Sequence, residues 1–172
     1  INNNHIKLRD CELMPSENKK AGQLNNEGIL FYNNGQFEEA LKRYNNALEE
    51  DPNFLEAWNN KGNVLRALGQ YEEALDAFDH GISIDPENPN PWLNKGAVYY
   101  ELQLFSESID CFDHALKNDP ENKLALNNKG AALGNLGKHE EALKCFEETL
   151  KIDPHDINAI TNKKILLDFL DK

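Results

Sequence analysis

The sequence predicts an all-α protein, a solenoid of antiparallel helical hairpins, and three observations support this prediction. The chain repeats itself every 34 residues. Within each repeat, large apolar residues recur at spacings that place them on one stripe of a helix. Glycine and proline stand where the helices of each repeat would end. The marks of the period are Gly28, Gly62, Gly96 and Gly130, and Pro52, Pro86, Pro120 and Pro154.

These marks divide the chain into four complete repeats and a half-repeat. The repeats are 21–54, 55–88, 89–122 and 123–156, and the half-repeat is 157–172. Residues 1–20 lie outside the register, so we expect them to form a tail, a linker to a neighbouring domain or an irregular cap. Because the chain begins with Ile1 and not with methionine, we expect it to be a piece of a longer protein.

The first helix of each repeat is expected to run through about position 14, counting from the first residue of the repeat. Large apolar residues at positions 4 and 11 and a glycine at position 8 share one face of this helix. At position 15, Gly35, Gly69 and Gly137 can adopt the left-handed conformation that ends a helix. Gln103 is the exception in the third repeat.

The second helix is expected to begin near the recurring Glu-Glu-Ala and to end at the Asp-Pro of positions 31 and 32. It carries small residues at positions 20 and 27 and an aromatic residue at position 24. Small residues on both helices allow a close approach, and the aromatic ring fills the space that remains. Each repeat is therefore predicted to be a helical hairpin.

The half-repeat 157–172 is expected to form a single helix that caps the stack. Lys164 stands where every complete repeat has glycine, so no second helix needs to approach there. The predicted role of the apolar residues in this helix is to cover the open end of the last hairpin. These residues are Ile160, Ile165, Leu167 and Phe169.

The repeated pattern resembles the tetratricopeptide repeat over about residues 21–172. The resemblance rests on Trp58 and Trp92 at position 4, glycine at 8, alanine at 20, Phe or Tyr at 24 and proline at 32, with departures at Ser108, Thr149 and His139. It implies that the hairpins stack in a right-handed superhelix, with the first helix of every repeat on the concave surface. It also implies a function in binding other proteins.

Composition and charge exclude several classes of partner. The chain has 18 Lys and Arg against 30 Asp and Glu, a formal charge of −12, which argues against nucleic acid. Most of this charge lies in residues 21–122, with 19 acidic and 6 basic residues, whereas 123–172 has eight of each. The sequence has no apolar run long enough to span a membrane. Its few, scattered cysteines and the lack of a leader favour the cytoplasm.

Neither catalysis nor cofactor binding is expected, and the protein is predicted to be non-enzymatic. The sequence contains no nucleophile elbow, phosphate loop or zinc-protease motif. The pairs Asp79-His80 and Asp113-His114 recur in adjacent repeats, about 8 to 10 Å apart, which is too far for one metal ion. The same spacing argues against a disulfide between Cys111 and Cys145.

One column of the repeat suggests the function, because position 6 is asparagine in all four repeats and in the half-repeat. A carboxamide offers an acceptor and two donors, so it can pair with an extended peptide backbone. The predicted binding residues are Asn26, Asn60, Asn94, Asn128 and Asn162, with Asn59, Asn63, Asn127, Arg66 and Tyr100 beside them on the same surface. The sequence therefore predicts a scaffold that binds an extended segment of a protein or peptide, and its acidic charge favours a basic one.

Several alternatives stay open at this stage. The asparagines can instead bridge adjacent repeats, and the recurring lysines at position 7, among them Lys61 and Lys95, can lie along the seam between repeats. The chain can also be a self-assembly module that forms a homo-oligomer, or an accessory domain of a larger enzyme. A clamp for a terminal carboxylate, as found in some repeats of this family, is not expected because the clamp positions lack lysine and arginine.

Overall fold

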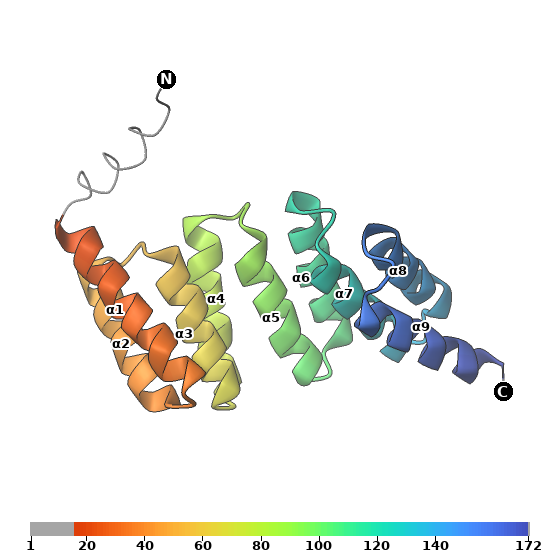
Figure 1. Ribbon diagram of the computed structural model, residues 1–172, viewed down its shortest axis with the longest axis horizontal. Helices are drawn as coiled ribbons and strands as arrows, with labels where there is room; N and C mark the ends of the chain where they lie inside the picture. Colours follow the sequence, from red (N-terminus) through yellow and green to blue (C-terminus); the bar gives the residue numbers. More distant parts are fainter. Residues whose placement is uncertain (1–15, 172) are drawn as a thin grey trace, which may run out of the picture.

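The computed structural model describes residues 16–171, and in this range the chain folds into nine α-helices (Figure 1). They are α1 (Ser16–Asn33), α2 (Phe37–Glu50), α3 (Leu55–Ala67), α4 (Tyr71–Ile84), α5 (Pro89–Glu101), α6 (Phe105–Asn118), α7 (Lys123–Asn135), α8 (His139–Ile152) and α9 (Ile157–Leu170). The expectations for residues 1–20 fall mostly outside the described residues. Ser16 to Lys20 form the start of α1.

Consecutive helices pack against one another as hairpins, so the predicted all-α solenoid is confirmed (Figure 1). In the described part of the chain, each odd-numbered helix also contacts the next odd-numbered helix, whereas no two even-numbered helices meet. The odd-numbered helices are therefore closer together and line the inner side of the curve. This side is where the sequence places the asparagine column.

The turn inside each hairpin has one conformation in all four repeats. Gly35, Gly69 and Gly137 have φ values of 73°, 74° and 76°, as predicted. Gln103 takes the same left-handed conformation, with φ of 61°. The backbone amide of Leu104 donates to the carbonyl of Tyr99 at 2.9 Å, as the equivalent residues do in the other turns. The third repeat thus departs from the pattern in residue type but not in geometry.

The core of each hairpin is the contact between the glycine at position 8 and the aromatic ring at position 24. Phe78 is completely buried, and a Cβ atom added to Gly62 would lie 2.5 Å from its ring. Two of the three residues that depart from the repeat pattern, Ser108 and Thr149, have hydroxyl groups that are hydrogen-bonded locally. The Ser108 hydroxyl donates to the carbonyl of Gly96 at 2.9 Å, and the Thr149 hydroxyl donates to that of Cys145 at 3.1 Å.

The last helix, α9, packs on the stack with a different face from the predicted one. Its buried residues are Ala159 and Leu166. The four residues that we expected to cover the last hairpin are all exposed, namely Ile160, Ile165, Leu167 and Phe169. That prediction was wrong because these residues stand at positions 4, 9, 11 and 13, which do not form the face that meets the preceding hairpin. Contact with the preceding hairpin uses positions 3 and 10 instead.

Ion pairs join successive hairpins at the lysines of position 7. Lys95 pairs with Asp79 at 2.5 Å, and the same pairing recurs between Lys129 and Asp113 and between Lys163 and Glu147. The acidic residue of each pair stands at position 25 of its repeat, and in the first repeat this position is Asn45. Lys61 instead lies 5.1 Å from the centre of the Trp58 ring, and burial lowers its pKa. The lysines therefore lie along the seam between repeats, as the sequence suggested.

The histidines and cysteines singled out in the sequence are packing residues. The rings of His80 and His114 stack on Trp58 and Trp92, each at 4.2 Å between centroids. No group of three potential metal ligands occurs among residues 16–171. Cys111 and Cys145 are free and buried, and burial raises the pKa of each thiol to about 11. No described helix has the length and hydropathy needed to cross a membrane.

Candidate functional site

The asparagines of position 6 all lie on odd-numbered helices, with one on each of α1, α3, α5, α7 and α9. Asn26 is exposed, and the other four are half-buried. They occupy the inner side of the curve, because the odd-numbered helices line it. Half-burial leaves each of these four carboxamides in contact with both the stack and the solvent.

Two of these asparagines are bonded to the preceding repeat. The side-chain amide of Asn60 donates to the carboxamide oxygen of Asn25, and that of Asn94 donates to the oxygen of Asn59, each at 2.9 Å. The alternative in which asparagines bridge adjacent repeats therefore holds for these two. Each of the donors keeps its own oxygen and a second N–H, so a ligand can still bond to them.

The chain of carboxamide bonds stops after α5. The acceptor position on α5 is occupied by Leu93, so Asn128 on α7 has no carboxamide to which it can donate. Asn127 restores the acceptor on α7, but its buried oxygen has no hydrogen-bond partner in the described part of the chain. Its amide donates instead to Asp156 at 3.1 Å. Asn128 and Asn162 are thus free of the bonds that hold Asn60 and Asn94.

These free carboxamides border a hollow of about 440 Å³ between α3, α5, α7 and α9. The polar residues that line it are Arg66, Asn94, Tyr100, Glu101, Asn128 and Asn162. Its apolar lining includes Leu93 and the exposed Leu124. The hollow brings together five of the ten residues that the sequence predicted for binding.

A second hollow of about 310 Å³ continues the first towards the end of the solenoid. It shares Tyr100, Ala131 and Asn162 with the first, and it is bounded by α5, α7, α8 and α9. The residues that make it apolar are Gly134, Phe146, Ile165, Leu166 and Phe169. The two hollows form one groove with a polar part and an apolar end.

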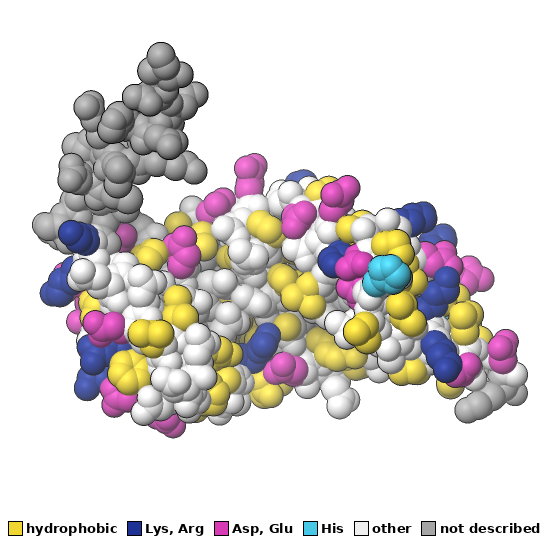
Figure 2. Space-filling view, in the orientation of Figure 1, with side chains coloured by type: hydrophobic (Ala, Val, Ile, Leu, Met, Phe, Trp, Pro, Cys, Tyr) yellow, Lys and Arg dark blue, Asp and Glu magenta, His cyan; other side chains and the backbone are white. Residues whose placement is uncertain are grey.

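The groove carries little charge. Arg66 and Glu101 are the only Lys, Arg, Asp or Glu residues that line the two hollows, and they form a long ion pair of 3.6 Å. In the view of Figure 2, white and yellow surface, which is uncharged, covers much of the middle of the face, and most of the dark blue and magenta charged side chains lie nearer its edges. A phosphate or carboxylate ligand would find no free cation in this lining.

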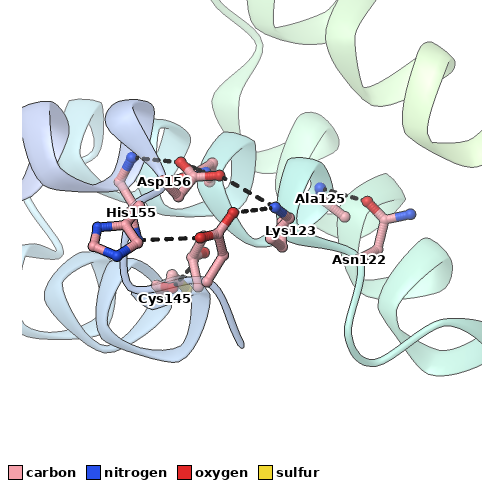
Figure 3. A network of polar contacts seen from close by, with 10 residues as sticks. Asn122, Lys123, Ala125, Cys145, His155 and Asp156 are labelled. Atoms are coloured by element: carbon pink, nitrogen blue, oxygen red, sulfur yellow. Dashed lines mark hydrogen bonds and ion pairs between the residues drawn. The ribbon is translucent and has the colours of Figure 1, made fainter. Parts of the chain in front are cut away.

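A polar network holds α9 in place against α7 and α8 (Figure 3). Asp156 accepts from the backbone amide of Ala159 at 2.9 Å, which caps the helix, and from the side chain of Asn127. Lys123 donates to Asp153 at 2.6 Å, and this bond lowers the pKa of Asp153. The network fixes the helix that supplies Asn162 and one wall of both hollows.

The structure leaves several predicted residues outside the groove and adds others. Asn26, Asn60 and Asn63 line neither hollow. Asn59 and Asn127 also lie outside the lining, and their side chains bond to neighbouring repeats. The sequence analysis missed the apolar end of the groove. A signal for it was present, because α7 has Gly134 at position 12, where the earlier repeats have Tyr32, Arg66 and Tyr100.

Three overlapping stretches of the chain match models of one repeat family, each described as tetratricopeptide repeat. They cover residues 25–89, 65–131 and 124–156. No curated protein matches the chain.

Several solved structures are similar to this chain. MamA (residues 41 to the end) from Desulfovibrio magneticus RS-1 is 21% identical with a TM-score of 0.78, over 88% of this chain and 86% of that one. YrrB, described as a TPR protein with an unusual peptide-binding site, is 24% identical with a TM-score of 0.70, over 91% and 84%. The first TPR of Spaghetti (RPAP3), bound to the HSP90 peptide SRMEEVD, is 28% identical with a TM-score of 0.66, over 69% and 94%.

Proposed function

This chain belongs to the tetratricopeptide repeat family, and on this premise we propose that it is a non-enzymatic scaffold that binds an extended segment of another protein. The segment lies in the groove between α3, α5, α7 and α9. Repeats of this family typically serve as protein–protein interaction modules. The groove supplies hydrogen bonds to the backbone of the segment, and its hollows receive the side chains.

The observation that carries the proposal is the position of three carboxamides around one hollow. Asn94, Asn128 and Asn162 come from successive inner helices and border the same space of about 440 Å³. Asn128 and Asn162 make no side-chain hydrogen bond to the described residues, and Asn94 keeps an unused oxygen. Inner helices about 8 to 10 Å apart match every third residue of an extended chain.

The similar structures support a peptide ligand but not a particular one. The RPAP3 repeats were solved with an HSP90 peptide, and they are 28% identical to this chain. The lining of the present groove has one cation, Arg66, which is already paired with Glu101. A ligand held mainly by its terminal carboxylate does not fit this lining.

The test begins with an array of random decapeptides screened against the full chain. The tightest peptide is then titrated against the variant in which Asn94, Asn128 and Asn162 are replaced by alanine. Each lost neutral hydrogen bond is worth about 0.5 to 1.5 kcal/mol, and two such bonds give an expected loss of about 1 to 3 kcal/mol in binding. Helicity should change little, and the melting temperature should fall slightly because Asn94 also donates to Asn59.

The matched control replaces Asn46 and Asn118 by alanine, since these asparagines lie on the even-numbered helices α2 and α6. Its affinity for the peptide should equal that of the unmodified chain. Equal affinity of the triple variant and the control would refute a role for the groove.

A further inference from the structure

We propose that the ligand segment is bound in the C-terminal half of the groove and is anchored there by one large apolar side chain, with a lysine or arginine about three residues away. This inference rests on the proposed function and names the partner chemistry of the same site. It departs from the sequence prediction, which assigned all five asparagines of position 6 to binding alike.

The hydrogen-bonding capacity of the asparagines locates the segment. Asn60 and Asn94 each use one N–H to bind the preceding repeat, whereas Asn128 and Asn162 are not tied in this way. The buried oxygen of Asn127 has no partner, although the equivalent oxygens of Asn25 and Asn59 accept the amide of the next repeat. Asn162 lines both hollows, and its amide does not donate to this oxygen.

The apolar end of the groove indicates the anchor. The hollow of about 310 Å³ lies beside Asn162 and is lined by Phe146, Ile165 and Phe169. Phe169 is 60% exposed and Ile165 is 63% exposed, so both present apolar surface that a ligand can cover. The hollow exists because Gly134 has no side chain, and a Cβ atom added there would meet nothing within 4 Å.

Charge indicates what flanks the anchor. Glu101 lines the polar hollow, one inner helix away from the apolar end, and its only cationic partner there is Arg66 at 3.6 Å. One step between inner helices, about 8 to 10 Å, equals about three residues of an extended chain. The first three repeats also carry most of the negative charge of the chain. The Glu101 side chain is 41% exposed against 29% for Arg66, and the first three repeats are net negative, so a cationic side chain that extends from the anchor towards α5 is favoured over an anionic one.

The probe is the peptide Gly-Lys-Ser-Ser-Phe-Ser-Ser-Lys-Gly, with capped ends, titrated into the isotope-labelled full chain and followed by NMR. Lysine lies three residues from the phenylalanine on both sides, so either direction of binding is tested. We expect the largest shifts in α7 and α9, around Gly134 and Ile165. Replacing the phenylalanine of the peptide by alanine should weaken binding at least tenfold, and replacing both lysines by glutamate should weaken it further.

Two glycine variants provide the matched comparison in the protein. Gly134→Leu fills the apolar hollow, while Gly22→Leu makes the same change in α1, where an added Cβ atom also meets nothing within 4 Å. Both changes favour the helix, so neither is expected to impair folding. Gly134→Leu should weaken the phenylalanine peptide at least tenfold and leave the alanine peptide unaffected, and Gly22→Leu should change neither.

Equal affinity of the phenylalanine and alanine peptides, or equal effects of the two glycine variants, would overturn the inference. If binding is then still lost on replacement of Asn94, Asn128 and Asn162, the proposed function survives without the apolar anchor. If the shifts map to the even-numbered helices, or no shift occurs at millimolar peptide, the inference fails, and the array peptide with the triple variant decides the proposed function separately. Shifts in α7 and α9 that depend on protein concentration without peptide would mean that a second copy of the chain is the occupant.

Discussion

Replacing Gly62 by alanine should destabilise the protein, although the same change is usually favourable in a helix. In an open helical position, alanine stabilises by about 0.5 to 1 kcal/mol relative to glycine. At Gly62 the new Cβ atom would lie 2.5, 2.7 and 2.8 Å from three atoms of the Phe78 ring. Phe78 is completely buried, so the ring can retreat only by displacing its neighbours.

The magnitude follows from these two opposing effects. Overpacking of a buried site typically costs about 1 to 3 kcal/mol, which exceeds the gain in helix propensity. We therefore expect Gly62→Ala to lower the free energy of unfolding by about 1 kcal/mol. Gly134→Ala is the internal reference and should raise it by about 0.5 to 1 kcal/mol, because the site is open. Urea denaturation followed by circular dichroism measures both values.

A double-mutant cycle tests the cause. In the background Phe78→Leu the smaller side chain leaves room for the new methyl group, so Gly62→Ala should become neutral or stabilising. The expected coupling between the two sites is about 1 to 2 kcal/mol. The reasoning is refuted if Gly62→Ala and Gly134→Ala shift stability by the same amount, or if the cycle shows no coupling.

Three further predictions concern pH, the ion pairs and the last helix. Burial raises the pKa of Cys111 and Cys145 from 9.0 to about 11. Thiols in the folded protein therefore keep their protons at pH values where those of the unfolded chain lose them, so the free energy of unfolding should fall as the pH rises from about 9 to about 11. Replacing both by alanine should reduce this slope in urea titrations across that range, and an unchanged slope would contradict the assignment. Asn45→Asp gives Lys61 an acidic partner and should raise the free energy of unfolding by up to about 1 kcal/mol at low ionic strength. If the gain comes from an ion pair, added salt should abolish it. Asp156→Ala removes the cap of α9 and should cost about 1 to 2 kcal/mol, whereas Asp156→Asn should retain most of the stability; similar losses in the two variants would show that the charge and not the cap matters.

Much of the fold could be predicted from the sequence because each hairpin is determined by local spacing. The glycine at position 8, the aromatic residue at 24 and the proline at 32 specify the contact and the end of each hairpin through sterics alone. The left-handed turn was not fully predictable, since Gln103 adopts it without being glycine. Tertiary packing of the hairpin imposes this conformation on a residue that does not favour it.

The candidate site was less predictable, because it depends on which neighbour each side chain meets. The asparagines of position 6 are identical in sequence, yet Asn94 is bonded to the stack and Asn128 is not. The difference lies at position 5 of the preceding repeat. For Asn94 this residue is Asn59, which accepts a hydrogen bond, and for Asn128 it is Leu93, which cannot. The error about α9 has a similar origin, because a lone helix contacts the stack with the face used between repeats, and Leu166 is buried in place of Leu167.

The polar network around Asp156 fastens the same helix that forms one wall of the groove, and this has a consequence for exchange measurements. Among the described helices α9 contacts only α7 and α8, so it is expected to open locally more readily than a helix packed on both sides, and each opening removes the binding surface. A bound segment therefore stabilises the helix Ile157–Leu170 against local opening. Slower hydrogen–deuterium exchange in this helix would report a bound segment even when its affinity is low.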